Sequence, residues 1–191
     1  MSRPAVVACG ALALDVRRIA RRRGWDLDVI PVPALLHNHP ERIAPAVSEL
    51  SAGHDVVALA YGDCGTYGAL DRLGLPRLAG EHCYDVFARS EVQAALQEEP
   101  GTYFLTDFLA RTFEHTVWRQ LGLDRHLELR EDYFRHYTRV MWLAQRPTAA
   151  TRRAAERAAA RLALPLVMRE VGDEGLEREL EGVLGAGPLT P

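Results

Sequence analysis

The chain alternates short apolar runs with longer segments in which apolar residues recur every three or four positions. Short apolar or β-branched runs are typical of buried strands, and the three-to-four spacing is typical of helices with one buried face. The predicted strands are residues 4–8, 26–33, 55–61, 75–80, 139–144 and 164–171, and residues 101–106 form either a further strand or an extended lead into a helix.

Helical patterns lie between these strands. The first runs through Leu12, Val16 and Ile19 and closes at Gly24. The others cover residues 40–50, 85–98, 108–121, 124–136 and 148–164, with a short helix toward Leu73 and a weak helix near the C-terminus. Strands that alternate with helices predict an α/β three-layer sandwich with a mostly parallel, Rossmann-like or flavodoxin-like sheet.

We expect a single α/β domain over residues 1–184 and a flexible C-terminal tail over 185–191, where glycine and proline gather. Residues 107–137 are a candidate for a small helical cap. With 191 residues and 48% apolar content, the chain is long enough to bury a core of its own. No apolar run approaches the roughly 18 residues of a membrane span, and the N-terminus has no signal-peptide layout, so we expect a cytoplasmic protein without a membrane partner.

Charge and motif content exclude several classes of function. All 23 basic residues are arginines, so a lysine Schiff base and a phosphate-binding loop ending in Gly-Lys are ruled out. The one dense basic run, residues 17–23, is read as a solvated helix face, and we expect no nucleic-acid partner. No serine occupies a Gly-x-Ser-x-Gly elbow, and GDCGTYG does not fit the dinucleotide-binding fingerprint.

The three cysteines stand in one recurring context. Cys9, Cys64 and Cys83 each follow a predicted strand. The carboxyl ends of parallel strands meet at one edge of a sheet, and in the common 2-1-3-4 strand order these strands are neighbours about 4.8 Å apart. We therefore predict that the sulfur atoms converge on a thiolate metal site. The alternative is that each cysteine packs as a small hydrophobic residue.

Glycines and polar residues near the cysteines complete the predicted site. Gly10, Gly62 and Gly65 would let the backbone approach an ion or ligand closely, which makes them cofactor-binding candidates. His37 is a possible fourth metal ligand, and His82 stands beside Cys83. Asp63 and Tyr61 are the catalytic candidates for proton transfer, and Asp63 and Asp85 are alternatively turn-forming or outer-sphere residues. A nucleophilic Cys64 assisted by His82 is a lesser possibility.

Five stretches in order resemble the family known as domain of unknown function 1638. They read VACGAL, LLHNHPERI, ALAYGDCGTYG, EHCYDVFARS and EEPGTYFLTDF. The resemblance implies cysteines at the positions of Cys9, Cys64 and Cys83 and a histidine at His37, whereas the family histidine falls one residue before His82. Asp107 stands where the family tends to show proline. Family members are often encoded near corrinoid-dependent methyl transfer and one-carbon metabolism.

Three readings of the site stay open. The first is a [4Fe-4S] cluster on the three cysteines with one iron open to a small-molecule substrate, an arrangement similar to that of quinolinate synthase. The second is zinc held by three thiolates with or without one histidine, in a structural or a thiol or methyl-transfer role. The third is a non-catalytic binding module for a small ligand, with Arg77 or Arg89 as counter-ion.

Overall fold

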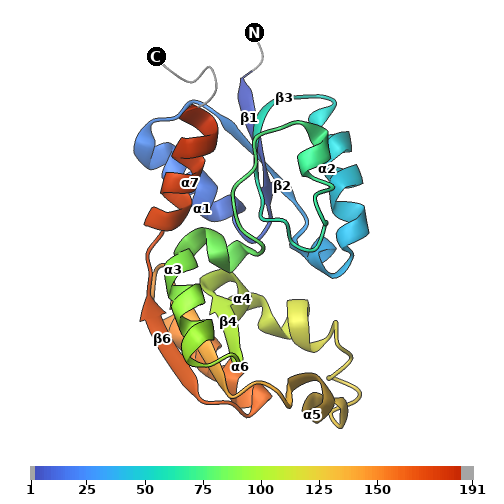
Figure 1. The fold of residues 1–191 in the computed structure, drawn as a ribbon, viewed down its shortest axis with the longest axis vertical. Coiled ribbons are helices and arrows are strands. Elements are labelled where there is room, and N and C mark those ends of the chain that lie inside the picture. Colours follow the sequence, from blue (N-terminus) through green and yellow to red (C-terminus); the bar gives the residue numbers. More distant parts are fainter. Residues whose placement is uncertain (1–2, 186–191) are drawn as a thin grey trace. The chain divides into compact units, whose positions relative to one another are not determined.

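The computed structural model describes residues 3–185. The strands in this range form two parallel three-stranded sheets (Figure 1). The described chain separates into two units by its internal contacts. The first unit holds the chain up to Val86 and again from Asp173, and the second runs from Phe87 to Gly172. The α/β class predicted from the sequence is confirmed.

The first sheet has the order β2-β1-β3, with β1 (Pro4–Cys9) between β2 (Asp28–Val32) and β3 (Asp55–Ala60). Parallel neighbours require crossovers, which α1 (Ala13–Arg23) and α2 (Ile43–Ser51) supply. Figure 1 draws α1 on one side of this sheet and α2 on the other, so β1 is covered on both faces. Its residues from Ala5 to Cys9 are all buried, as expected for the central strand of a three-layer sandwich.

Short 3₁₀ helices complete the connections of the first unit. They are Ala34–Asn38, Pro40–Arg42 and Asp71–Leu73. The first two follow β2, so the predicted helix of residues 40–50 begins as a 3₁₀ turn before α2.

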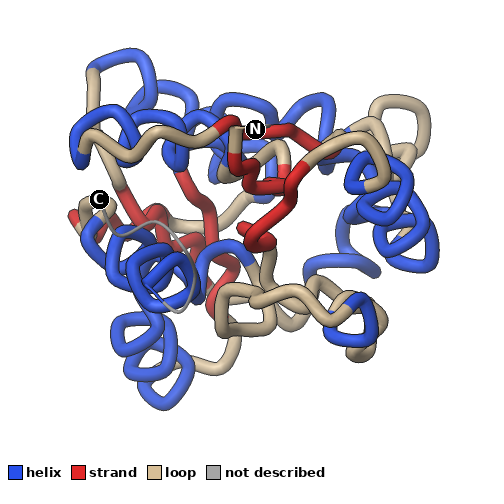
Figure 2. The backbone as a smooth tube through the Cα atoms, turned by 90° about the horizontal axis from the view of Figure 1, so that it is seen from above, coloured by secondary structure: helices blue, strands red, loops and turns tan. Residues whose placement is uncertain are grey.

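The second sheet has the order β4-β5-β6, from β4 (Thr102–Thr106), β5 (Arg139–Ala144) and β6 (Leu166–Glu170). Its helices are α4 (Asp107–Phe113), a π-helix (Glu114–Trp118), α5 (Leu129–Phe134) and α6 (Ala149–Leu162). Leu105, Val140 and Trp142 pack against the buried face of α6 in one apolar cluster. Helices flank the strands in the tube view as well (Figure 2).

The helix α3 (Cys83–Glu98) begins in the first unit, and most of it belongs to the second. Its backbone is not helical at Ala88, where two helical pieces meet in a kink. In the second unit, the Arg139 guanidinium donates to the carbonyl oxygen of Ala95 on α3 at 3.0 Å.

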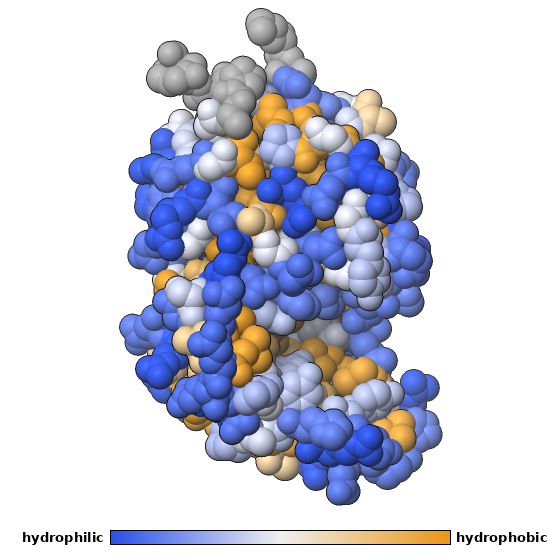
Figure 3. Space-filling model, viewed as in Figure 1, coloured by the Kyte–Doolittle hydropathy of each residue, from blue (hydrophilic) through white to orange (hydrophobic). Residues whose placement is uncertain are grey.

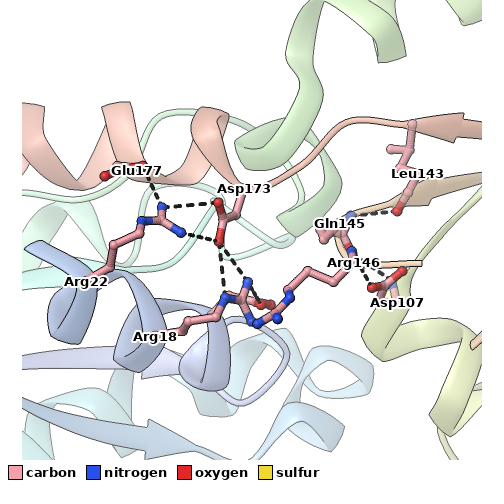
Figure 4. Close-up of polar contacts among 9 residues, drawn as sticks. Arg18, Arg22, Asp107, Leu143, Gln145, Arg146, Asp173 and Glu177 are labelled. Atoms are coloured by element: carbon pink, nitrogen blue, oxygen red, sulfur yellow. Dashed lines mark hydrogen bonds and ion pairs between the residues drawn. The ribbon is translucent and has the colours of Figure 1, made fainter. Parts of the chain in front are cut away.

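The last helix, α7 (Glu174–Gly185), returns to the first unit. Leu176, Leu180 and Leu184 form its buried face. Asp173, just before it, accepts hydrogen bonds from Arg18 and Arg22 of α1 (Figure 4). Apolar packing and ion pairing therefore hold α7 to the first unit.

The structure differs from the sequence-based prediction at residues 75–80 and in having two sheets. Residues 75–80 form no full strand: Arg77 makes a single bridge to Leu59 of β3, because Pro76 has no amide proton to extend the ladder. The later strands then start a second sheet instead of extending the first.

Residues 107–137 are helical in large part and form the crossover from β4 to β5. The tail predicted for 185–191 begins at Gly185, the last residue of α7, and its other residues lie outside the described part.

The visible surface is largely hydrophilic, with apolar residues in separate patches (Figure 3). None of the helices in residues 3–185 combines the length and the apolar composition that a membrane span needs.

Candidate functional site

Cys9 ends β1 and is buried, with 6% of its surface exposed. The turn after it is fixed because the Gly10 amide donates to the Val32 carbonyl oxygen at 2.8 Å. Burial raises the pKa of the Cys9 thiol, and the Ala11 amide, the Tyr61 hydroxyl and the Leu12 amide act in the opposite direction. The Leu12 amide donates to the Cys9 carbonyl oxygen at 2.8 Å. These donors would stabilise a thiolate at this position.

Cys64 follows β3 and is buried in a left-handed backbone conformation, with φ of 52°. Its amide donates to the Glu81 carbonyl oxygen at 2.7 Å, and the Asp63 amide donates to the Gly80 carbonyl oxygen at 2.9 Å. The Cys64 loop is thus hydrogen-bonded to the segment that leads to Cys83. Burial, together with the charges of Cys9 and Asp63, raises the pKa of the Cys64 thiol to about 12.

Cys83 is the first residue of α3 and is partly buried. The Asp85 carboxylate holds the helix start by accepting from the His82 amide at 2.9 Å and the Glu81 amide at 3.1 Å. Burial, then the charges of Cys9 and Cys64, raise the pKa of the Cys83 thiol well above its ordinary value.

Tyr61, the residue after β3, is affected by all three cysteines. Its side chain is buried, with 2% exposed, and its pKa is raised first by burial, then by Cys9 through charge and a hydrogen bond, and then by the charges of Cys64 and Cys83. Cys9 ends β1, Cys64 follows the neighbouring strand β3, and the Cys64 amide donates to the carbonyl oxygen of Glu81, shortly before Cys83. The three cysteines therefore lie at the carboxyl edge of the first sheet.

The gathered thiols are not a preassembled ion site. In residues 3–185, no group of three or more histidine, cysteine, aspartate or glutamate side chains is arranged to hold a metal ion.

Of the two candidate histidines, only His82 adjoins a cysteine in sequence. His82 stacks on Tyr84 with ring centroids 4.8 Å apart, and its Nδ1 lies 3.6 Å from Asp85 Oδ2. His37 lies in the 3₁₀ helix after β2. Burial by the surrounding protein, and next the charge of His82, lower the pKa of His37.

The Asp63 carboxylate is engaged on both oxygens within its own turn. It accepts hydrogen bonds from the Thr66 hydroxyl at 3.0 Å and from the amides of Tyr67 and Gly68 at 3.0 and 2.9 Å. Burial alone would raise the pKa of Asp63, but these donors and the charge of Arg77 hold the pKa below its ordinary value. Asp63 is therefore an anion at neutral pH.

The three predicted cofactor-binding glycines lie where chain segments approach each other. A Cβ on Gly10 would stand 2.8 Å from the Val32 carbonyl oxygen, and one on Gly62 would stand 3.2 Å from the Gly80 carbonyl oxygen. Gly65 has φ of 76°, which favours glycine, and it lies beside Pro40. Their close approaches are to the protein's own chain.

Arg77 has a larger role in the site than the sequence indicated. Its guanidinium donates to the Leu78 carbonyl oxygen at 2.8 Å and to the Asp71 carboxylate at 2.8 Å, and its charge acts on both Cys64 and Asp63. Arg77 braces the segment beside the Cys64 loop. Only the pairing of that segment with residues 59–64 reveals this role.

Comparison with known proteins places the chain in a family. Searches among curated proteins and among solved structures each returned no match. The family described as "Protein of unknown function (DUF1638)" matches residues 15–180, a range that includes Cys64 and Cys83 and begins after Cys9. Because this match covers most of the chain, the protein belongs to the DUF1638 family.

Proposed function

We propose that the first unit is a thiolate metal centre in which Cys9, Cys64 and Cys83 bind a [4Fe-4S] cluster with one iron open to a small-molecule substrate. The observation that carries the proposal is the placement of all three cysteines at one sheet edge: Cys9 ends β1, Cys64 follows the neighbouring β3, and the Cys64 amide bonds to the segment that leads into Cys83. Packing of cysteines as independent small hydrophobic residues gives no reason for this convergence.

The donor set fits a soft metal. Three thiolates suit iron–sulfur clusters and zinc alike. Thiolates that share one zinc ion at about 2.3 Å from it stand only about 4 Å from each other. A [4Fe-4S] cluster spreads its ligands over separate irons, so three cysteines leave one iron without a protein thiolate. The open iron would supply Lewis-acid chemistry toward a hydroxyl, carboxylate or sulfur group.

The chain's own groups prepare the thiols for deprotonation. The amides of Ala11 and Leu12 and the Tyr61 hydroxyl favour a thiolate at Cys9, and the Arg77 charge favours a thiolate at Cys64. Burial outweighs these effects and keeps the thiols protonated, so loading of the centre releases protons.

Tyr61 is the neutral hydrogen-bond donor that we assign to the site. Burial and the neighbouring thiols raise its pKa, which keeps the hydroxyl protonated at neutral pH. Free thiols of this kind persist in a reducing compartment, which is consistent with the cytoplasmic location we propose. The proximity of family genes to one-carbon metabolism makes a small substrate of that chemistry our preferred class.

Purification without oxygen tests the proposal. Iron, zinc and acid-labile sulfide are measured together on the same sample, with the visible absorbance spectrum. Brown protein with iron and sulfide in equal amounts supports the cluster. Colourless protein with stoichiometric zinc and no sulfide would show that the site is a zinc centre and not a cluster. Metal-free protein that takes up neither on reconstitution overturns the metal centre and leaves a binding module.

Single substitutions connect the metal to the three cysteines. Cys9→Ala, Cys64→Ala and Cys83→Ala should each abolish stoichiometric loading. Val7→Ala is the matched control, because it truncates another fully buried side chain of β1 without removing sulfur. Equal metal content in Cys64→Ala and Val7→Ala would contradict the assignment of Cys64 as a ligand.

A further inference from the structure

The turn that carries Cys64 is built almost entirely from left-handed backbone. Cys64, Gly65, Tyr67 and Gly68 have φ of 52°, 76°, 49° and 75°. Glycine adopts this region freely, but cysteine and tyrosine do so only against a steric penalty. Other interactions must therefore hold Cys64 and Tyr67 in this conformation.

The Asp63 side chain supplies those interactions after Cys64. One oxygen accepts from the Thr66 hydroxyl and the Gly68 amide, and the other accepts from the Tyr67 amide. On the other side of the turn, backbone hydrogen bonds hold the chain. The amides of Asp63 and Cys64 donate to the carbonyl oxygens of Gly80 and Glu81. The Asp63 side chain and these backbone hydrogen bonds thus hold Cys64 from both sides, and Cys64 is buried.

We propose that Asp63 is a positioning residue for the Cys64 thiol and not a proton-transfer group. Both carboxylate oxygens are engaged as acceptors with the turn's own donors. Without the carboxylate, the turn relaxes from its left-handed conformation and the Cys64 sulfur leaves its buried place. The inference rests on the proposed function only where it treats Cys64 as a metal ligand.

Alkylation of metal-free protein by iodoacetamide, mapped by mass spectrometry, tests the positioning directly. In the native protein Cys64 should react slowly. Asp63→Ala should accelerate its alkylation at least tenfold while Cys9, buried at the end of β1, stays protected and reports that the unit is folded. Asp63→Asn keeps one acceptor oxygen and should restore part of the protection.

The negative charge of Asp63 also acts on the Cys64 thiol. A variant that weakens the turn and keeps this charge is therefore needed. Thr66→Val removes one of the three hydrogen bonds and leaves the charge in place. It should accelerate Cys64 alkylation several-fold. Asp26→Asn, which removes one charge at an exposed position of the same unit, should leave the rate unchanged. Unchanged Cys64 alkylation in both Asp63→Ala and Thr66→Val would overturn the positioning role.

Reconstitution with iron and sulfide separates this inference from the proposed function. Native protein that loads while Asp63→Ala loads at least tenfold less supports both. Native protein that takes up no metal, with Cys64 still selectively exposed by Asp63→Ala, supports the positioning and overturns the metal centre. Equal loading and equal alkylation in native protein and Asp63→Ala overturn the positioning alone.

Discussion

The Tyr61 hydroxyl donates a hydrogen bond to the Cys9 sulfur, which joins the residue after β3 to the end of β1 inside the first unit. Both residues are buried. Because β1 and β3 are neighbours in register, with Ala8 opposite Ala60, the next residues along each strand emerge together at the carboxyl edge. The sheet register thus sets the geometry of the site before any loop residue contributes.

Tyr61→Phe should lower the free energy of unfolding by about 1 kcal/mol, because it removes one buried hydrogen bond while keeping the ring. The expected result in urea denaturation is a lower midpoint with an unchanged slope. Tyr103→Phe in the second unit is the control for loss of a tyrosine hydroxyl. Equal effects of the two substitutions would argue against a specific contribution of the Tyr61–Cys9 bond.

Gly10→Ala should destabilise the protein by about 1–3 kcal/mol, since the new Cβ overlaps backbone atoms that have no room to move. That Cβ would stand 2.8 Å from the Val32 carbonyl oxygen and 2.9 Å from the Ala34 amide nitrogen. Gly53→Ala is the matched control, because a Cβ there meets nothing within 4 Å. Thermal unfolding of both variants measures the difference, and a Gly10→Ala protein as stable as Gly53→Ala would show that this turn is not tightly packed.

The sequence was sufficient to predict the strands of the first sheet. Apolar runs located β1 and β3, and parallel pairing brings their carboxyl ends to one edge, so Cys9 and Cys64 could be placed together without a local motif. The second sheet was not foreseen. Strand partners far apart in sequence depend on packing that periodicity does not encode, and only Pro76 hinted that residues 75–80 would fail to extend the first sheet.

Side-chain roles were harder to predict than positions. An aspartate between glycine and cysteine suits either proton transfer or a turn, and the choice depends on which donors the folded loop turns toward Asp63. The hydrogen bonds from Thr66, Tyr67 and Gly68 favour the turn. The burial of Tyr61 among the thiols likewise follows from the register of β3 beside β1 and from no residue pattern.

Asp173→Asn should lower the free energy of unfolding by about 2 kcal/mol at neutral pH, because Arg18 and Arg22 both donate to this nearly buried carboxylate. Arg18 Nη2 lies 2.9 Å from Oδ2, and Arg22 Nη2 lies 3.1 Å from Oδ1 (Figure 4). Urea denaturation of both proteins measures the loss. Asp124→Asn in the second unit is the control for removal of one carboxylate.

The Asp173 contribution should also depend on pH. Burial alone would raise the pKa of Asp173, but the hydrogen bonds from Arg22 and Arg18 outweigh it and lower the pKa below its ordinary 3.8. The stabilisation is therefore fully present above pH 3.8 and disappears as the pH falls through the lowered folded-state pKa. Unfolding measured from pH 6 downward should show the native protein and Asp173→Asn converging in acid. A constant difference across that range would contradict the link to this carboxylate.

Asp107→Ala should destabilise the second unit by about 2–4 kcal/mol, because the buried Trp142 indole and the Arg146 amide lose their acceptor. The Trp142 indole donates to Oδ1 at 2.9 Å, and the Arg146 amide donates to Oδ2 at 2.8 Å. Thermal unfolding measures the loss. Asp132→Ala, at an exposed position of α5, is the control and should change stability little.

A double substitution separates the orphaned indole from the rest of this loss. Trp142→Phe in the Asp107→Ala background removes the donor that has no acceptor, so its cost should be smaller there than in the native background by about 1 kcal/mol.

Asp107 is also the first residue of α4, after the Thr106 cap, a position that accommodates proline well. Asp107→Pro, which matches the residue implied by the family resemblance, should keep the helix start but lose more stability than Asp107→Ala, because it also removes the amide that donates to Gln145 Oε1 at 2.7 Å. A proline variant as stable as the native protein would show that the carboxylate contributes nothing that the ring cannot replace.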